Sequence, residues 1–98
     1  MNGKSMSKWK NLEIIGKPYA LDILETISKS PKRYSDLKEV CPVDKTRTKR
    51  LRELELLGLT ETINKKIEEK DRTFIHYRLT KRGKNIVSIA LKMLEKEN

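Results

Sequence analysis

Basic side chains concentrate between residues 44 and 52, and their types suit contact with a polyanion. Five of these nine residues are Lys or Arg and one is acidic, whereas Glu53 and Glu55 follow directly. In a helix, Arg and Lys near the first turns can donate hydrogen bonds to guanine O6 and N7, and Thr can touch a thymine methyl group. The residues that we expect to contact DNA in this segment are Lys45, Thr46, Arg47, Lys49, Arg50 and Arg52.

The same charges have a second interpretation: a run of charged residues on a helix is often only a solvated face. Lys49 and Glu53, four residues apart, could form an ordinary intrahelical pair. Arg47 fits neither DNA contact nor a solvated face easily, since a helical wheel puts it on the inner side of the helix with Leu51. Two explanations stay open: its stem covers the core while its guanidinium reaches a phosphate, or the helix begins one residue later.

A second group of basic side chains lies between residues 64 and 72. It is mixed with three acidic residues, so it is less cationic than a strong minor-groove arm. Contact with the DNA backbone or minor groove and simple solvation are about equally good explanations. The candidates are Lys65, Lys66, Lys70 and Arg72.

No other residues combine into a chemical site. His76 has no Cys or carboxylate at metal-ligand spacing, so we interpret it as a structural histidine. Cys41 is the single cysteine and has no resolving partner, which favours a small apolar residue packed in a turn over a redox sensor. There is no Gly-rich phosphate loop and no plausible set of Ser, His and Asp. We therefore expect no enzyme activity, no metal and no cofactor.

The basic segment is positioned by a predicted helix-turn-helix. Periodic apolar residues predict helices from Pro18 to Ser28 and from Ser35 to Cys41. Pro42 ends the second of these, and the next helix runs over about 44–57, from a cap at Asp44 to Gly58. A turn of three residues between two helices is typical of this motif, whose second helix enters the major groove.

A β-hairpin and two terminal helices complete the predicted domain. After Gly58 the period changes to that of strands, which predicts a hairpin over about 59–79 that would form a wing. Helices are predicted over about 8–15 and, from a cap at Thr80, over about 80–96. The last helix is apolar over a wide arc, which indicates a homodimer. The expected interface residues are Trp9, Leu12, Val87, Leu91 and Leu94.

Length and charge agree with this interpretation. The 98 residues suit one domain, 1–98, of a mainly α fold with a small antiparallel hairpin (α+β), the winged helix-turn-helix. The 23 Lys and Arg outnumber the 14 Asp and Glu, giving a net charge of +9, which favours a polyanionic partner. No apolar run is long enough to span a membrane, so we expect a cytoplasmic, nucleoid-associated protein.

Several segments together resemble the HxlR-type winged-helix regulators and, more loosely, the MarR and ArsR groups. They are residues 15–24, 31–37 and 49–55, Gly58-Leu59, and residues 77–80 with Gly83. The resemblance covers about residues 12–94 and implies a homodimer that binds a palindromic operator. The chain departs from the pattern in two places: it lacks the cysteine near the N-terminus that many such regulators use to sense electrophiles, and Arg47 occupies an apolar position.

The main hypothesis from the sequence is thus a dimeric DNA-binding transcriptional regulator. Two alternatives remain open. One is a chromatin or architectural protein that binds DNA without sequence preference, and the other is a winged-helix module that binds a protein partner in a larger assembly. Binding to one DNA site in preference to random duplex would separate the first alternative from the main hypothesis. The sequence does not indicate which small molecule or redox signal, if any, acts as an effector.

Overall fold

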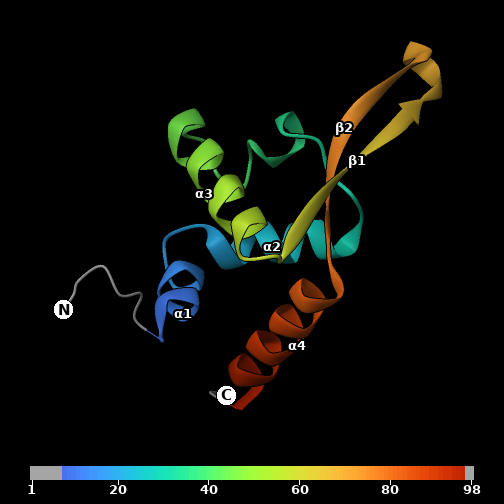
Figure 1. Ribbon diagram of the computed structural model, residues 1–98. Helices are drawn as coiled ribbons and strands as arrows, with labels where there is room; N and C mark the ends of the chain where they lie inside the picture. Colours follow the sequence, from blue (N-terminus) through green and yellow to red (C-terminus); the bar gives the residue numbers. More distant parts are fainter. Residues whose placement is uncertain (1–7, 97–98) are drawn as a thin grey trace.

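The computed structural model describes residues 8–96, and the elements follow one another along the chain in the predicted order (Figure 1). Four α-helices and one antiparallel hairpin confirm the predicted fold class. None of the described helices is long and apolar enough to cross a membrane. The elements are α1 (Lys10–Ile15), α2 (Ala20–Lys29), the 3-10 turn η1 (Ser35–Leu37), α3 (Asp44–Leu56), β1 (Thr60–Ile67), the 3-10 turn η2 (Glu68–Lys70), β2 (Arg72–Leu79) and α4 (Lys81–Lys96).

Helix α2 forms the centre of the core, and it begins later than Pro18. Tyr19 has a left-handed backbone with φ of +73°, so regular helix starts only at Ala20. From there Ile23, Leu24 and Ile27 recur at helical spacing and are buried. They pack with buried residues of the other elements in one hydrophobic cluster that includes Leu37, Cys41, Leu51, Leu54, Leu59, Leu79 and Val87.

The first helix of the helix-turn-helix is shorter than predicted. Residues 35–41 form one 3-10 turn followed by hydrogen-bonded turns, not a continuous α-helix. The expected cap at Ser35 is wrong as well, because the carboxylate of Asp36 accepts the Arg33 N–H at 2.9 Å. Cys41 N–H donates to Leu37 O at 2.9 Å, which closes the segment and buries both side chains.

Helix α3 runs over nearly the predicted range. Val43 is its N-cap residue and makes no side-chain cap bond, so Asp44 lies in the first turn instead of capping it. There its negative charge still favours the positive end of the helix dipole. At the other end Gly58 has φ of +76°, the left-handed conformation predicted for the residue after the helix.

The hairpin pairs β1 with β2 in register from Thr60 opposite Leu79 to Ile67 opposite Arg72. A third segment joins it, which the sequence pattern did not predict. Lys32 N–H donates to Tyr77 O at 2.9 Å, and Tyr77 N–H donates to Lys32 O at 2.7 Å. The chain between α2 and η1 is thereby fastened to the base of the wing.

Thr80 joins the exit of α3 to the start of α4. Its hydroxyl accepts the Gly83 N–H at 3.1 Å, which confirms the predicted cap, and donates to Gly58 O at 2.6 Å. Its own N–H donates to Leu59 O at 3.0 Å. Gly83 lies so close to Leu59 that an added Cβ would overlap the Leu59 carbonyl oxygen. The segment after α3 and the first turn of α4 therefore meet in a tight, hydrogen-bonded junction.

Candidate nucleic-acid interface

The outer face of α3 carries three exposed basic residues, Lys45, Lys49 and Arg52, around a shallow hollow of about 500 Å³. Thr46, in the first turns, is half-buried. The described part of the chain gives none of the three basic side chains an ion pair. The N-terminal end of α3, η1 and the hairpin tip all lie on the side of the molecule opposite α4 (Figure 1).

Arg47 is buried, and the expectation that it contacts DNA is wrong. Its side chain is 1% exposed. Nη1 donates to Cys41 O at 2.6 Å, Nη2 pairs with the Asp44 carboxylate, and the guanidinium lies over the ring of Tyr34. The helical wheel correctly places Arg47 on the inner side of α3. Neither explanation offered from the sequence holds. The helix does begin at Asp44, and the guanidinium is buried together with its stem instead of reaching outward to a phosphate.

Arg50 holds α3 against the corner between α1 and α2. Its Nε donates to Pro18 O at 2.9 Å and its Nη1 to Glu53 Oε1 at 3.0 Å, while Lys17 Nζ donates to Glu53 Oε2 at 2.8 Å. The Arg50 side chain is 11% exposed. It therefore acts in positioning the helix, and Glu53 pairs with Lys17 and Arg50 rather than with Lys49.

The electrostatics of this cluster act on Glu53. Burial alone would raise the pKa of the carboxyl group, but the hydrogen bond and charge of Lys17 and the charge and hydrogen bond of Arg50 outweigh it. The pKa of Glu53 is consequently below its ordinary value of 4.5. The carboxylate stays ionised at neutral pH and holds the two cations in place.

Tyr34 supports the start of α3, a role that the sequence did not reveal. Its hydroxyl donates to Asp44 O at 3.0 Å and shares a hydrogen bond of 2.7 Å with Thr48 Oγ1. The only signal in the sequence was the inward Arg47, since a buried guanidinium needs oxygen atoms and an aromatic face near it. The ring of Tyr34, the carbonyl of Cys41 and the carboxylate of Asp44 supply these groups, while Arg47 Nε has no hydrogen-bond partner among the described residues.

The predicted wing residues Lys65, Lys66, Lys70 and Arg72 are all exposed. Lys66 is paired with Asp71 at 3.5 Å, and Arg72 lies over the ring of Phe74 at 4.7 Å. These four residues lie on the hairpin. The hollow described above is lined only by residues of α3, so the wing residues are not part of it.

Cys41 and His76 are interior residues. Burial raises the pKa of the Cys41 thiol, and the charges of Arg47 and Arg50 reverse this only in part. His76 is 6% exposed and its Nδ1 is 3.0 Å from Phe74 O. Within residues 8–96 no three His, Cys, Asp or Glu side chains come together in a way that could hold a metal ion.

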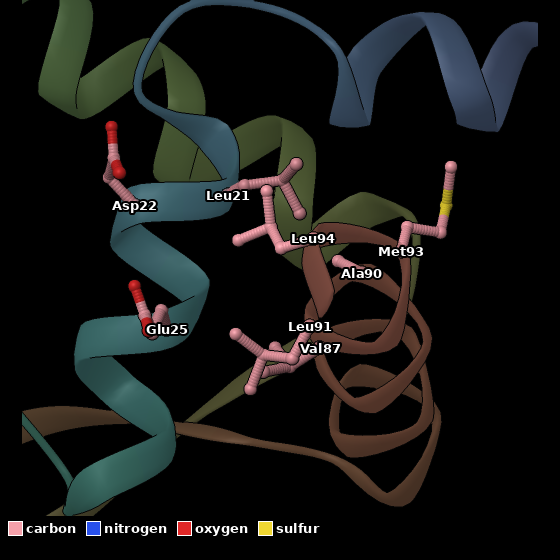
Figure 2. A pocket seen from close by; sticks show the side chains of 8 residues that line it. All are labelled: Leu21, Asp22, Glu25, Val87, Ala90, Leu91, Met93 and Leu94. Atoms are coloured by element: carbon pink, nitrogen blue, oxygen red, sulfur yellow. The ribbon is translucent and has the colours of Figure 1, made fainter. Parts of the chain in front are cut away.

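Large apolar side chains are also exposed on α4, on α1 and at Trp9, the residue before α1. Trp9 and Leu12 are 55% and 57% exposed, and Leu91 and Leu94 are 40% and 56% exposed. Val87 is the exception among the residues expected at a dimer interface, because it is 6% exposed and belongs to the core of the chain itself. A largely apolar groove of about 360 Å³ lies between α2 and α4. In Figure 2 the side chains of Leu91 and Leu94, on α4, point toward α2, and Leu21 points from α2 toward Leu94.

Comparisons with known proteins agree with the architecture described above. The sequence pattern of the HxlR-like helix-turn-helix family matches residues 14–97. A comparison with curated protein sequences gives no match.

Solved structures of regulators are similar to the chain along most of its length. The HTH-type transcriptional regulator ytcD is 32% identical, over 93% of this chain and 92% of that one, with a TM-score of 0.72. The redox regulator HypR in its reduced form is 25% identical, over 87% and 83%, with a TM-score of 0.71. The reduced transcriptional regulator YodB from B. subtilis is 22% identical, over 93% and 90%, with a TM-score of 0.74, and shares the fold.

Proposed function

The chain belongs to the HxlR-like helix-turn-helix family of transcriptional regulators, and from this premise we propose that it binds double-stranded DNA as a homodimer. In the proposal α3 enters the major groove, with the wing near the backbone or the minor groove. The supporting observation is the division of the basic residues of α3. Arg47 and Arg50 are held by the protein itself, while Lys45, Lys49 and Arg52 are exposed and have no ion pair in the described chain.

The proposed contacts follow from this division. Lys45 and Lys49 lie nearest the N-terminal end of α3, which is the end whose side chains reach base edges in helix-turn-helix proteins. Thr46 is half-buried beside them and could touch a thymine methyl group. Arg52 lies about two turns beyond Lys45 and suits a backbone phosphate. Lys65, Lys66, Lys70 and Arg72 would contact the backbone or minor groove from the wing.

The dimer would use the apolar surface of α1 and α4. Trp9, Leu12, Leu91 and Leu94 are apolar and more than a third exposed, so a second copy that covers them would remove apolar surface from water. A dimer whose twofold axis runs toward the DNA would present two copies of α3 on one face, as reading of a palindromic DNA site requires. Val87 would stabilise this arrangement only indirectly, through the core beneath α4.

The test is DNA binding by the triple variant Lys45→Ala, Lys49→Ala, Arg52→Ala. Fluorescence anisotropy would compare a duplex from the DNA upstream of the protein's own coding sequence with a random duplex, at two salt concentrations. We expect the wild type to prefer one site in the upstream duplex, and the variant to bind it about 100-fold more weakly. The matched control is Lys84→Ala with Lys92→Ala on α4, which should bind like the wild type if sedimentation shows the same oligomer.

The outcomes separate the alternatives. Equal affinity of the wild type for both duplexes would favour the chromatin or architectural protein. Failure to bind either duplex would overturn the proposed function and favour the protein-interaction module. Unchanged binding by the triple variant would show that α3 is not the DNA-contacting helix.

A further inference from the structure

Two arginines from segments that are distant in the sequence lie over the ring of Phe74, in β2. The guanidinium carbon of Arg72 lies 4.7 Å from the ring centroid, and that of Arg33 lies 5.1 Å from it. Arg72 is the first residue of β2, and Arg33 precedes η1. Two guanidinium groups therefore lie within about 10 Å of each other, joined by one aromatic ring.

The backbone fixes this arrangement. The paired hydrogen bonds between Lys32 and Tyr77 lay the segment before η1 along β2, which brings Arg33 beside Phe74. The Arg33 N–H donates to Asp36 Oδ2 at 2.9 Å, which also sets the direction of the chain at this point. Arg33 is thus held from two sides before any ligand arrives.

The charge of the pair is poorly compensated. Asp36 Oδ1 lies 3.6 Å from Arg33 Nη2, and both side chains are partly exposed, so this ion pair is weak in water. The described chain gives Arg72 no ion pair. Stacking on a ring uses the flat face of a guanidinium and leaves its N–H edge available, and that edge matches the oxygen atoms of a phosphate.

We propose that Arg33 and Arg72, stacked on Phe74, form a binding site for backbone phosphates of DNA at the junction of the wing and the helix-turn-helix. This inference rests on the proposed function and adds Arg33 and Phe74 to its contacts. The site lies next to η1, on the side of the molecule that also holds the N-terminal end of α3 and the hairpin tip (Figure 1). Arg33 and Arg72 bind the phosphates, and Phe74 is a positioning residue.

The experiment measures how the Kd for a random-sequence 20-base-pair duplex depends on salt between 50 and 200 mM. A random duplex suffices because phosphate contacts are independent of sequence. Each phosphate contact contributes about 0.9 to the slope of log affinity against log salt. We expect Arg33→Ala and Arg72→Ala each to lower the slope by about 0.9, and the double variant to lower it by about 1.8.

Two further variants separate the site from general charge. Lys92→Ala removes one charge from α4 and should leave the slope unchanged. Phe74→Leu keeps both arginines but removes the ring, and it should weaken binding about threefold to tenfold at fixed salt. Circular dichroism of every variant checks that the fold is retained.

Each outcome is decisive. A double variant with the wild-type slope and affinity would overturn the phosphate site and leave the proposed function standing. Wild-type affinity of Phe74→Leu, with lowered slopes in the arginine variants, would overturn the positioning role of the ring. A wild type that binds no duplex at all would overturn both proposals together.

Discussion

The guanidinium of Arg47 lies over the ring of Tyr34, with 4.4 Å between the guanidinium carbon and the ring centroid. The same guanidinium donates to Cys41 O, and the hydroxyl of Tyr34 donates to Asp44 O. Each residue thus bonds the backbone at one end of the turn between η1 and α3. The pair stabilises the geometry of the helix-turn-helix from inside the protein.

Replacing Arg47 should destabilise the fold without changing the exposed basic face of α3. Arg47→Ala leaves Cys41 O without its donor and opens a cavity beneath Tyr34, so we expect a loss of about 3 kcal/mol in the free energy of unfolding. Arg52→Ala, exposed on the same helix, should lose less than about 0.5 kcal/mol. Urea unfolding followed by circular dichroism measures both. Equal stability of the two variants would contradict the structural role of Arg47.

Glu53 should make the stability of the protein depend on pH in the acid range. Its pKa is lower in the folded chain than its ordinary value of 4.5, so the unfolded chain binds the proton more readily. The contribution of Glu53 is therefore fully present above about pH 4.5 and is lost as the pH falls through the lower, folded pKa.

The measurement compares wild type with Glu53→Gln in urea. At pH 7 we expect the variant to be less stable by about 1–2 kcal/mol, because Lys17 and Arg50 lose a charged acceptor. The difference should shrink as the pH is lowered below 4. Glu55→Gln, exposed on the same helix, is the control and should differ little at either pH. A difference that stays constant with pH would contradict the ion-pair cluster.

Cys41 should be an unreactive thiol in the native protein. Burial raises its pKa, and reaction requires the thiolate and access to it. We expect the native protein to react with a disulfide reagent at pH 8 about 100-fold or more slowly than the urea-unfolded protein. Cys41→Ala should bind DNA like the wild type. Rapid native labelling, or loss of DNA binding after it, would show that the turn opens more readily than its packing indicates.

Gly83 should tolerate no side chain, although it lies within a helix. In a helix interior alanine is normally more favourable than glycine by about 1 kcal/mol. Here the added Cβ would overlap the carbonyl oxygen of Leu59, a backbone atom that cannot move without disturbing the junction. We expect Gly83→Ala to lose about 2 kcal/mol or more in thermal or urea unfolding, and Asn85→Ala, exposed on the same helix, to lose nothing. A stabilised Gly83→Ala would mean that the two helices can separate freely.

The elements of the fold were largely predictable because their signals are local. The range of α3, the glycine after it and the Thr80 cap follow from residue types within a few positions. The predictions failed where distant segments interact. The β-bridge at Lys32 depends on β2, more than forty residues away, and the short η1 depends on the burial of Leu37 and Cys41 in the common core.

The candidate site was predictable as a segment but not residue by residue. Periodicity showed that Arg47 points inward, but it could not supply the oxygen atoms and the ring that accept a buried guanidinium. It also put Arg50 on the flank of the helix, where Glu53 is a neighbour three residues along the same helix but only the fold brings Pro18 O to the Arg50 Nε. The exposure of Lys45, Lys49 and Arg52 was easier to predict, because an exposed charge needs no partner within the protein; their contact with DNA stays a prediction.

In the proposed dimer, the junction at Thr80 would help to set how far apart two DNA half-sites can lie. Because Thr80 bonds both Gly58 and Gly83, and Leu59 leaves no room beside Gly83, α4 keeps one direction relative to the end of α3. In the proposed dimer α4 meets its twofold mate, so the separation of the two α3 helices is decided within each protomer. Inserting base pairs between half-sites should then abolish dimer binding instead of being absorbed by a flexible protein.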